Sequence, residues 1–465
     1  MPSRYPTGSI SSPIARRSSR RSLLGRGLAL GAAGLTGSLA GRSSVAAQDK
    51  TELTFMHWGS LLEKEEMAKT IEAFEELHPD ISVDQQYIPG DYDTKLNALV
   101  AAGDVPDVFY IGSGPLFEWA LEGRLLDFTP YVEQYPTVQD RLPQTFMYSE
   151  PGRTVGNWIA IEMCTLYYNR DLYDEAGVPY PPATAETAWT WDQLVETAKL
   201  LTLDNDGRNA TESDFDPDNI KQYGITIPRW FYAWYPLVRS NGGDITDETG
   251  TQFTLDSPEA VDVFQKLQDL IYVHHVSPTP TQEENLPATN IRLQTRRVAT
   301  AIDGQWALLD VAAAGINFSV GVLPKLQEPV THLSCASTVI NADTPNLEAA
   351  IEFYVSHTNP QLNITPFANG LWMPMERKYY TDQALIDSWT ANDAHPPEYR
   401  TAVMDYTLNH GVRGPAEALK NWASIDPRGA SSLDPLWTGE KNAQDALADM
   451  KAAVQPLLEG KTPTE

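Results

Sequence analysis

The segment Leu53-Thr54-Phe55-Met56-His57-Trp58 alternates in side-chain character and ends at Gly59-Ser60, which predicts a β-strand. Apolar residues then recur at helical spacing until His78-Pro79, where the proline ends the helix. Residues 81–87 and 108–111 are further predicted strands, with a helix over 93–102 between them. Strands that alternate with helices predict a parallel sheet covered on both faces, so the expected fold class is α/β.

Loops that follow the strands of such a sheet are the first places to look for a binding site, because ligands bind beyond the carboxyl ends of parallel strands. These loops are residues 58–60, 89–92 and 112–115. Their candidate ligand-binding side chains are Trp58, Ser60, Asp91, Tyr92 and Ser113. Ordinary turn chemistry is the alternative explanation for each of them.

The remainder of the chain continues the alternation. Strands are predicted over 155–162, 223–227, 298–302, 318–323 and 338–341, and helices over 191–202 and 231–240. Ser257-Pro258 supplies a capping hydroxyl and a proline for the start of another helix. Thr344-Pro345 supplies the same pair for a helix that continues through Val355. Residues 372–465 are expected to be mainly helix and loop. A chain of 465 residues exceeds one hydrophobic core, so at least two compact bodies are expected.

The charge is strongly acidic. Lys and Arg total 34 against 62 Asp and Glu, which gives a net charge of -28. No basic stripe with interleaved aromatic residues occurs. Affinity for nucleic acid depends on Lys and Arg displacing counterions, so nucleic acid and anionic membrane surfaces are excluded as partners.

The N-terminus has the layout of a Tat export signal over residues 1–47. Ser19-Arg20-Arg21-Ser22-Leu23-Leu24 is a paired-arginine motif, a short apolar run covers 27–35, and small residues precede a cleavage site after Ala47. A disordered basic arm is the alternative. The signal predicts a protein outside the cytoplasmic membrane, periplasmic or extracellular. Whether the signal is removed or kept as an anchor stays open.

Six segments of the sequence follow one another in the order that is typical of a known protein family. They are residues 71–81, 95–108 (Lys95-Leu96 with Ala101-Ala102-Gly103-Asp104-Val105-Pro106-Asp107-Val108), 159–169, 189–194, 236–243 and 303–306 (Asp303-Gly304-Gln305-Trp306). In this order they resemble the extracellular solute-binding proteins of bacterial ABC sugar importers, the family of maltose-binding protein, over nearly the whole of the chain after the signal.

The resemblance implies a two-lobed periplasmic-binding-protein type II fold with a ligand cleft between the lobes and a hinge of crossing segments. Lobe one would comprise 49–162 plus 319–355, lobe two 167–317 plus 372–465, and the hinges 163–166, 318 and 356–371. The implied function is capture of a mono- or oligosaccharide and its delivery to ABC permease subunits by hinge closure. The implied protein is a monomer, without a cofactor and without catalytic activity.

A sugar presents hydroxyls, which need polar partners, and C–H faces, which pack on flat aromatic rings. By resemblance, Glu162 accepts hydroxyl hydrogen bonds and Trp306 stacks on the ligand. Trp230 and Tyr232 match positions that make polar and aromatic ligand contacts in maltose-binding protein, although Trp230 replaces an acidic residue of that protein. Further stacking candidates, with core packing as the alternative, are Trp372 and Trp422.

The sequence also contains a candidate metal site, two cysteines and features compatible with two rival functions. Asp204, Asp206, Asp214 and Asp216 are rich enough in oxygen for a calcium site, although a solvated acidic loop is favoured. Cys164 and Cys335 either form a disulfide or stay as two buried thiols. The rival functions are a secreted glycoside hydrolase or lyase, and a binding protein for a polyol phosphate or a polyamine. Hydrolysis needs a pair of carboxyls at defined separation, and no local pair indicates one.

Overall fold

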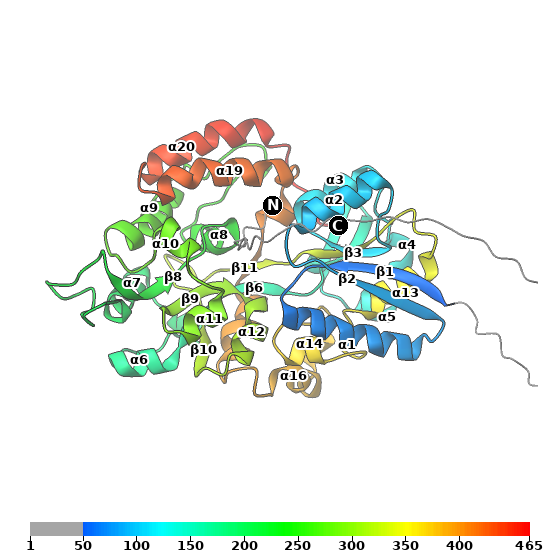
Figure 1. The fold of residues 1–465 in the computed structure, drawn as a ribbon. Helices are drawn as coiled ribbons and strands as arrows, with labels where there is room; N and C mark the ends of the chain where they lie inside the picture. Colours follow the sequence, from blue (N-terminus) through cyan, green and yellow to red (C-terminus); the bar gives the residue numbers. More distant parts are fainter. Residues whose placement is uncertain (1–49) are drawn as a thin grey trace, which may run out of the picture.

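The protein is described by a computed structural model over residues 50–465, so the predicted export signal at 1–47 lies outside the described residues. The chain forms two lobes (Figure 1). One contains β1–β3, α1–α5 and α13, and the other contains α6–α12 with α19 and α20. Strands β6 and β11 lie between them in this view. No helix within 50–465 has both the length and the apolar character needed to cross a bilayer.

The sheet of the first lobe has the order β12-β3-β1-β2. Its strands are β1 (Thr51–His57), β2 (Ile81–Tyr87), β3 (Val108–Ile111) and β12 (Ser337–Ile340). Strand β1 pairs in parallel with β2 and β3, and β12 joins β3 antiparallel. Helices α1 (Leu61–Leu77), α2 (Tyr92–Ala102) and α3 (Ser113–Leu121) connect or follow these strands. The predicted succession of strands and helices is confirmed here.

The second sheet runs β13-β11-β6-β9-β8-β7, with β10 also paired to β6. Its strands are β6 (Glu162–Asn169), β7 (Leu203–Asp204), β8 (Ile220–Thr226), β9 (Val298–Gly304), β10 (Phe318–Gly321), β11 (Thr331–Ser334) and β13 (Gly411–Arg413). A separate hairpin joins β4 (Phe146–Glu150) to β5 (Arg153–Asn157).

The remaining helices surround these sheets. They are α4 (Thr129–Val132), α5 (Pro136–Gln139), α6 (Arg170–Ala176), α7 (Trp191–Leu201), α8 (Phe231–Ser240), α9 (Pro258–Tyr272), α10 (Pro280–Glu284), α11 (Thr289–Gln294), α12 (Leu308–Ala313), α13 (Leu347–Ser356), α14 (Thr365–Ala368), α15 (Lys378–Thr381), α16 (Gln383–Thr390), α17 (Tyr406–His410), α18 (Pro415–Ala418), α19 (Trp422–Trp437) and α20 (Ala443–Val454). Ser257 caps α9 as predicted, because its side chain accepts a hydrogen bond from the Ala260 N–H.

Two local predictions are wrong. The strand expected over 155–162 is interrupted: β5 ends at Asn157, and β6 begins at Glu162. Glu162 therefore opens a strand instead of closing one. Helix α13 begins at Leu347 after Asn346, because the Thr344 hydroxyl is engaged by Asp107 and by the Asn346 N–H.

The C-terminal region is divided between two cores. Trp372, Trp389 and Tyr399 belong to the cluster that contains the strands of the first lobe. Residues 416–454 pack instead in the second cluster, with α8 and α9. The sequence placed all of 372–465 in lobe two, so the packing of 372–406 differs from that expectation. The physical reason is that α14 contacts both α1 and α16.

Strand β6 links the two cores. Met163 and Tyr167 contribute to the first cluster, whereas Cys164 and Leu166 contribute to the second. Successive strand residues face opposite sides of a sheet, so one strand can serve both cores. Both thiols are buried and free, so Cys164 and Cys335 are not joined in a disulfide.

Candidate functional site

Three aromatic rings of the second lobe form a continuous surface. Trp230 stacks on Tyr232 with ring centroids 5.0 Å apart and planes inclined by 16°. Trp306 meets Tyr232 edge-on at 4.9 Å and approaches Trp230 at 6.1 Å. Trp230 is 41% exposed, whereas Tyr232 is 4% exposed. Three side chains that the sequence proposes as ligand contacts therefore lie together, and their role in binding stays a prediction.

The position of the Trp306 ring is set by Gly304. A Cβ atom added to Gly304 would lie 2.1–2.2 Å from three carbons of the indole, so the ring rests directly on the glycine backbone. Tyr167 fixes the same turn, because its hydroxyl donates to the carbonyls of Gly304 and Gln305 at 3.1 and 3.0 Å. Trp306 packs against both hydrophobic clusters, which places it at the boundary between the lobes.

The first lobe contributes the turn between β1 and α1. The Trp58 ring meets Tyr92 edge-on at 4.8 Å and Tyr110 at 5.3 Å. Ser60 caps α1 by accepting the Glu63 N–H at 3.2 Å. Gly59 has φ 133°, and a Cβ there would lie 2.1 Å from a Glu63 carboxylate oxygen. Only a glycine leaves room for Glu63 to fold back over this turn.

The half-buried carboxyl of Glu63 lies close enough to those of Glu162 and Asp310, also half-buried, for their charges to act on it. Burial raises the pKa of Glu63 well above its ordinary range, and the nearby Glu162 and Asp310 charges add to this. Burial also raises the pKa of Glu162 to about 8, and the nearby Cys335 thiol opposes part of this rise. Burial raises the pKa of Asp310, and the nearby Ser60 hydroxyl opposes part of this rise. Glu63 lies on α1 and Asp310 on α12, and these two helices are in contact. Glu162 is the first residue of β6.

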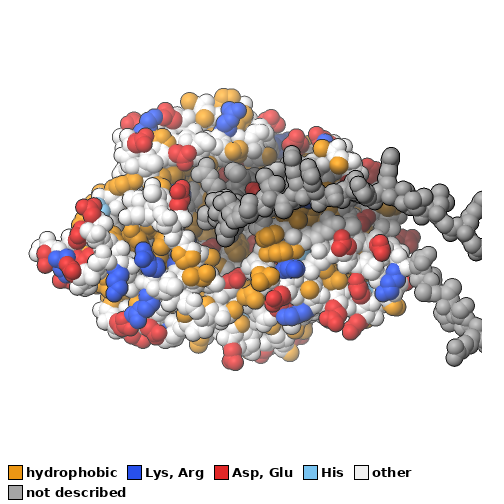
Figure 2. Space-filling view, viewed as in Figure 1, with side chains coloured by type: hydrophobic (Ala, Val, Ile, Leu, Met, Phe, Trp, Pro, Cys, Tyr) orange, Lys and Arg blue, Asp and Glu red, His pale blue; other side chains and the backbone are white. Residues whose placement is uncertain are grey.

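We call this set the interlobe cluster: Trp58, Ser60, Glu63, Tyr87, Glu162, Trp230, Tyr232, Trp306, Asp310 and Cys335. Tyr87 joins it because the charges of Glu63 and Asp310 contribute to the rise in its pKa after burial. The Tyr87 hydroxyl donates to the Gly59 carbonyl at 3.0 Å. Hydrophobic side chains gather in the middle of the molecule, and acidic side chains are spread over both lobes (Figure 2).

Sequence reasoning missed four members of the cluster: Glu63, Tyr87, Asp310 and Cys335. A signal existed for two of them. Glu63 lies three residues after the capping Ser60, so the first turn of α1 positions it. Asp310 lies four residues after Trp306, a spacing that puts two side chains on one helical face. Nothing local in the sequence indicates Tyr87 or Cys335.

Other predicted residues serve packing or contacts elsewhere. Trp372 is 2% exposed and packs against Phe367, which supports the core-packing alternative for this residue. The buried Tyr92 hydroxyl donates to the carbonyls of Met56 and Tyr110 at 3.1 and 2.8 Å. Asp91 is exposed at the start of α2, with φ 51°. These positions support the packing or turn explanation.

Ser113 and Trp422 lie at a second contact between the lobes. The Ser113 hydroxyl donates to Glu417 at 3.0 Å, and Ser334 donates to the same carboxylate oxygen. A Cβ on Gly114 would lie 3.3 Å from the Ala423 backbone, so α3 closely approaches the start of α19. Trp422 is 3% exposed, with its ring 5.0 Å from Phe231. Ser113 therefore bonds one lobe to the other, and Trp422 is a buried core residue next to this contact.

The acidic loop is organised around an arginine, which supports the favoured alternative of a solvated loop over a calcium site. Arg208 occupies the acidic loop and forms ion pairs with Asp204, Asp206 and Asp214 at 2.7, 2.7 and 3.4 Å. The Asp204 carboxylate also accepts the N–H groups of Asp206, Arg208 and Asp216. A guanidinium thus supplies the positive charge here. Within the described range, no group of three or more His, Cys, Asp or Glu is arranged to hold a metal.

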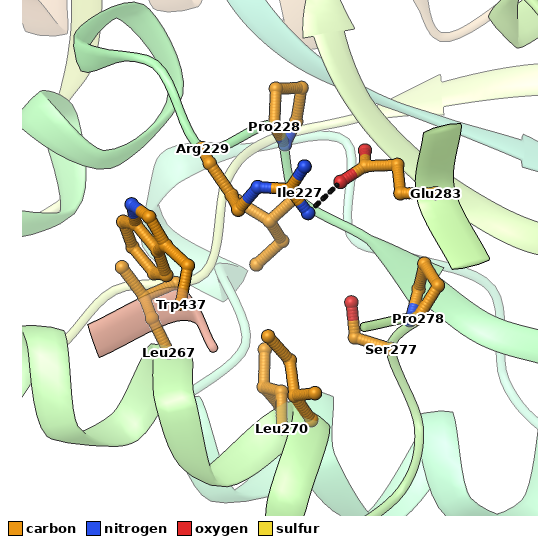
Figure 3. Close-up of a pocket in the computed structure, with 10 residues that line it drawn as sticks. Ile227, Pro228, Arg229, Leu267, Leu270, Ser277, Pro278, Glu283 and Trp437 are labelled. Carbon is orange, nitrogen blue, oxygen red and sulfur yellow. Dashed lines mark ion pairs between the residues drawn. The ribbon is translucent and has the colours of Figure 1, made fainter. Parts of the chain in front are cut away.

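A narrow cavity of about 10 Å³ lies apart from the interlobe cluster, between α9, α10 and α19 (Figure 3). Arg229 and Glu283 form an ion pair across it at 2.7 Å, and Leu267, Leu270 and Trp437 supply its apolar walls. A volume of this size holds about one water molecule. It is a packing defect of the second lobe and cannot admit a sugar.

Residues 58–358 match the family described as bacterial extracellular solute-binding protein, and the chain belongs to this family. The arabinooligosaccharide-binding protein of Halalkalibacterium halodurans is 30% identical over 188 residues, 39% of this chain and 36% of that protein. The maltotriose-binding protein of Pyrococcus abyssi is 27% identical over 254 residues, 53% of this chain and 48% of that protein. Each alignment spans under half of the relative's length.

Among solved structures, the ABC substrate-binding protein Lmo0181 from Listeria monocytogenes, in complex with cycloalternan, has a TM-score of 0.74. It is 26% identical and covers 88% of this chain and 99% of its own. The fold is thus the two-lobed type II fold that the sequence predicts, and its relatives are binding proteins.

Proposed function

We propose that this protein captures a mono- or oligosaccharide in the cleft between its lobes and delivers it to an ABC permease when the hinge closes. One observation carries the proposal: aromatic rings and carboxyl groups from both lobes meet in the interlobe cluster. Rings pack on the C–H faces of a sugar, and carboxylates accept its hydroxyl hydrogens. The carbohydrates in the printed names of the relatives support the same class of ligand.

Contact with both lobes gives the ligand its effect on conformation. Trp58 and Glu63 lie at the start of α1 in the first lobe, Trp306 and Asp310 follow β9 of the second sheet, and Glu162 begins the strand that links the two cores. A ligand held by all of them favours the closed state, because it makes these contacts together only there. The hinge segments 163–166, 318 and 356–371 remain part of this proposal.

The proposal includes export by the Tat route, a location outside the cytoplasmic membrane, a monomeric state and the absence of catalysis. The absence of catalysis must be tested against one alternative, a glycoside hydrolase, because carboxyl groups with a raised pKa in a sugar site also characterise these enzymes. A polyol phosphate fits poorly, because the cluster contains no arginine and Glu63 places a carboxyl group at the N-terminus of α1, where a phosphate would bind.

The test is a thermal-shift and calorimetric screen of mono- and oligosaccharides on the purified mature protein. We expect at least one sugar to raise the melting temperature and to bind with one-to-one stoichiometry. Mass spectrometry after prolonged incubation should recover the sugar unaltered. Cleavage products would favour the hydrolase instead, and a failure of every sugar to bind would overturn the proposal.

A further inference from the structure

The two lobes contact each other on both sides of the strands that link them. Helix α1 of the first lobe contacts α12 of the second lobe, and α3 of the first lobe contacts α18 and α19 of the second. Helices α1 and α12 lie on one side of β6 and β11, and α3 and α19 lie on the other side (Figure 1). The space between the lobes over β6 and β11 is therefore bounded by protein at two opposite ends.

The second sheet sets the distance between these two ends. Its order places β11 and β6 between β13, which leads into α18, and β9, which leads into α12. At this edge of the sheet, Ser334 lies opposite Glu162, and Cys164 lies opposite Gly304. Strands β13 and β9 are three strand spacings apart, about 14 Å. Because a sugar ring is about as wide as one strand spacing, the space left over β6 and β11 holds about two rings.

The end on the α3 side is closed by a buried bridge of hydrogen bonds. The Ser113 hydroxyl of α3 and the Ser334 hydroxyl of β11 donate to the same oxygen of Glu417 on α18. Glu417 is 1% exposed, so solvent is excluded from the bridge. One residue further along α3, a Cβ added to Gly114 would lie 3.3 Å from backbone atoms of Ala423. A sugar chain cannot continue through this end of the cleft while the bridge is intact.

The opposite end carries the aromatic surface. Trp306 packs against both hydrophobic clusters where α12 follows β9, and α12 is in contact with α1. Trp230 is 41% exposed, and the rings of Trp306 and Trp58 are half-buried, so all three keep surface that a ligand can cover. Rings of this kind pack on the C–H faces of a sugar, which places the ligand against the α12 side.

We propose that the cleft encloses a mono- or disaccharide and excludes longer linear and cyclic sugars, and that the bridge between Ser113 and Glu417 sets this limit. The inference rests on the carbohydrate-capture function proposed above. A third sugar ring would reach the α3 side, where it must break the bridge or hold α3 away from α19. Either change leaves buried polar groups without partners and so weakens binding. A cyclic sugar has no chain end to place between the two contacts.

The experiment compares sugars of one chemistry and increasing length by calorimetry on the purified mature protein. The panel is D-glucose, maltose, maltotriose and maltohexaose; L-arabinose, arabinobiose and arabinotriose; D-xylose, xylobiose and xylotriose; and α-cyclodextrin as the cyclic member. In the series that binds, we expect the monosaccharide or the disaccharide to bind at least about tenfold more tightly than every longer member, because the longer sugars must break the bridge. No binding of α-cyclodextrin is expected.

Two variants test the end on the α3 side by different changes, so that one remains informative if the other does not fold. Glu417→Ala removes the acceptor of the bridge, and Gly114→Val adds a side chain that holds α3 away from Ala423. In either variant, the trisaccharide should bind within about threefold of the disaccharide. Glu376→Ala is the matched control, because Glu376 is also a fully buried glutamate and lies opposite Arg141 in the first lobe. This control should keep the preference for short sugars. Melting temperatures confirm folding.

The outcomes separate this inference from the function on which it rests. If a trisaccharide or a longer sugar binds the unaltered protein as tightly as its disaccharide, the length limit is excluded and carbohydrate capture stands. If the preference for short sugars persists in folded Glu417→Ala and Gly114→Val proteins, or is lost equally in Glu376→Ala, the bridge does not set the limit. If no sugar of the panel binds, carbohydrate capture fails and the length limit fails with it.

Discussion

Ser60, which caps α1, lies close enough to Asp310 on α12 for its hydroxyl to lower the pKa of that carboxyl. The residue that caps α1 therefore also faces α12, the helix that α1 contacts. Because the first turn of α1 carries Glu63 as well, the cap, the contact between the lobes and the carboxyl cluster depend on the same few residues.

The Ser60→Ala variant tests this double role. Loss of the cap should lower the free energy of unfolding by about 1 kcal/mol. Loss of the hydroxyl should also weaken ligand binding, because Ser60 belongs to the interlobe cluster and faces Asp310 on α12. Ser257→Ala is the matched control, since Ser257 caps α9 in the same way away from the interlobe cluster. Denaturant unfolding should show that the two variants are destabilised equally. Calorimetry should show that only Ser60→Ala binds the ligand more weakly.

Trp306→Ala should reduce ligand affinity at least about tenfold with little loss of stability, because a half-buried stacking ring is removed. Gly304→Ala should produce a similar loss with the tryptophan still present, since the new methyl group would occupy the place of the indole. Calorimetry with the sugar found in the screen measures both. Full affinity in either folded variant would contradict the stacking role of Trp306.

Trp372→Ala should have the opposite effects to Trp306→Ala: a large loss of stability and no loss of ligand affinity. The side chain is 2% exposed in the first core, and removal of a buried tryptophan typically lowers the free energy of unfolding by about 3–5 kcal/mol. Ligand affinity per folded molecule should stay unchanged. Urea unfolding and calorimetry distinguish this from Trp306→Ala. A Trp372 variant that is stable but does not bind would restore the stacking interpretation.

Glu162 should make the stability of the ligand-free protein depend on pH. Its pKa rises from 4.5 to about 8 on folding, so the folded chain binds more protons than the unfolded chain between these values. The free energy of unfolding then falls as pH rises from about 4.5 to 8, by at most about 1.4 kcal/mol per unit for this group. Glu162→Gln should flatten that slope in thermal unfolding scans. An unchanged slope would show that Glu162 titrates normally.

Arg208→Gln should lower the melting temperature, because Asp204 would lose the cation that pairs with it in the acidic loop. Chelator treatment of the unaltered protein should leave the melting temperature unchanged, and added calcium should not raise it. Differential scanning fluorimetry measures all three. A calcium-dependent rise would mean that the loop binds the metal in spite of Arg208.

The sequence by itself determined the α/β class, the bounds of several elements before residue 356 and part of the site. Alternation in β1 and the apolar run of β3 are local patterns, and α8 has its predicted bounds because its signals are also local. Trp230, Tyr232 and Trp306 could be found because family motifs surround them. Glu162 was found for the same reason, although the strand around it was misplaced.

Only the tertiary structure decided which side chains meet. Trp372 and Trp306 are both tryptophans beside glycines in the sequence, yet one lies in a core and the other on the boundary between the lobes. Glu63, Glu162 and Asp310 lie far apart in the chain, and their proximity follows from how α1, β6 and α12 are brought together. Local patterns specify helices and strands because those depend on neighbouring residues. A binding cluster depends on long-range packing, which no local pattern records.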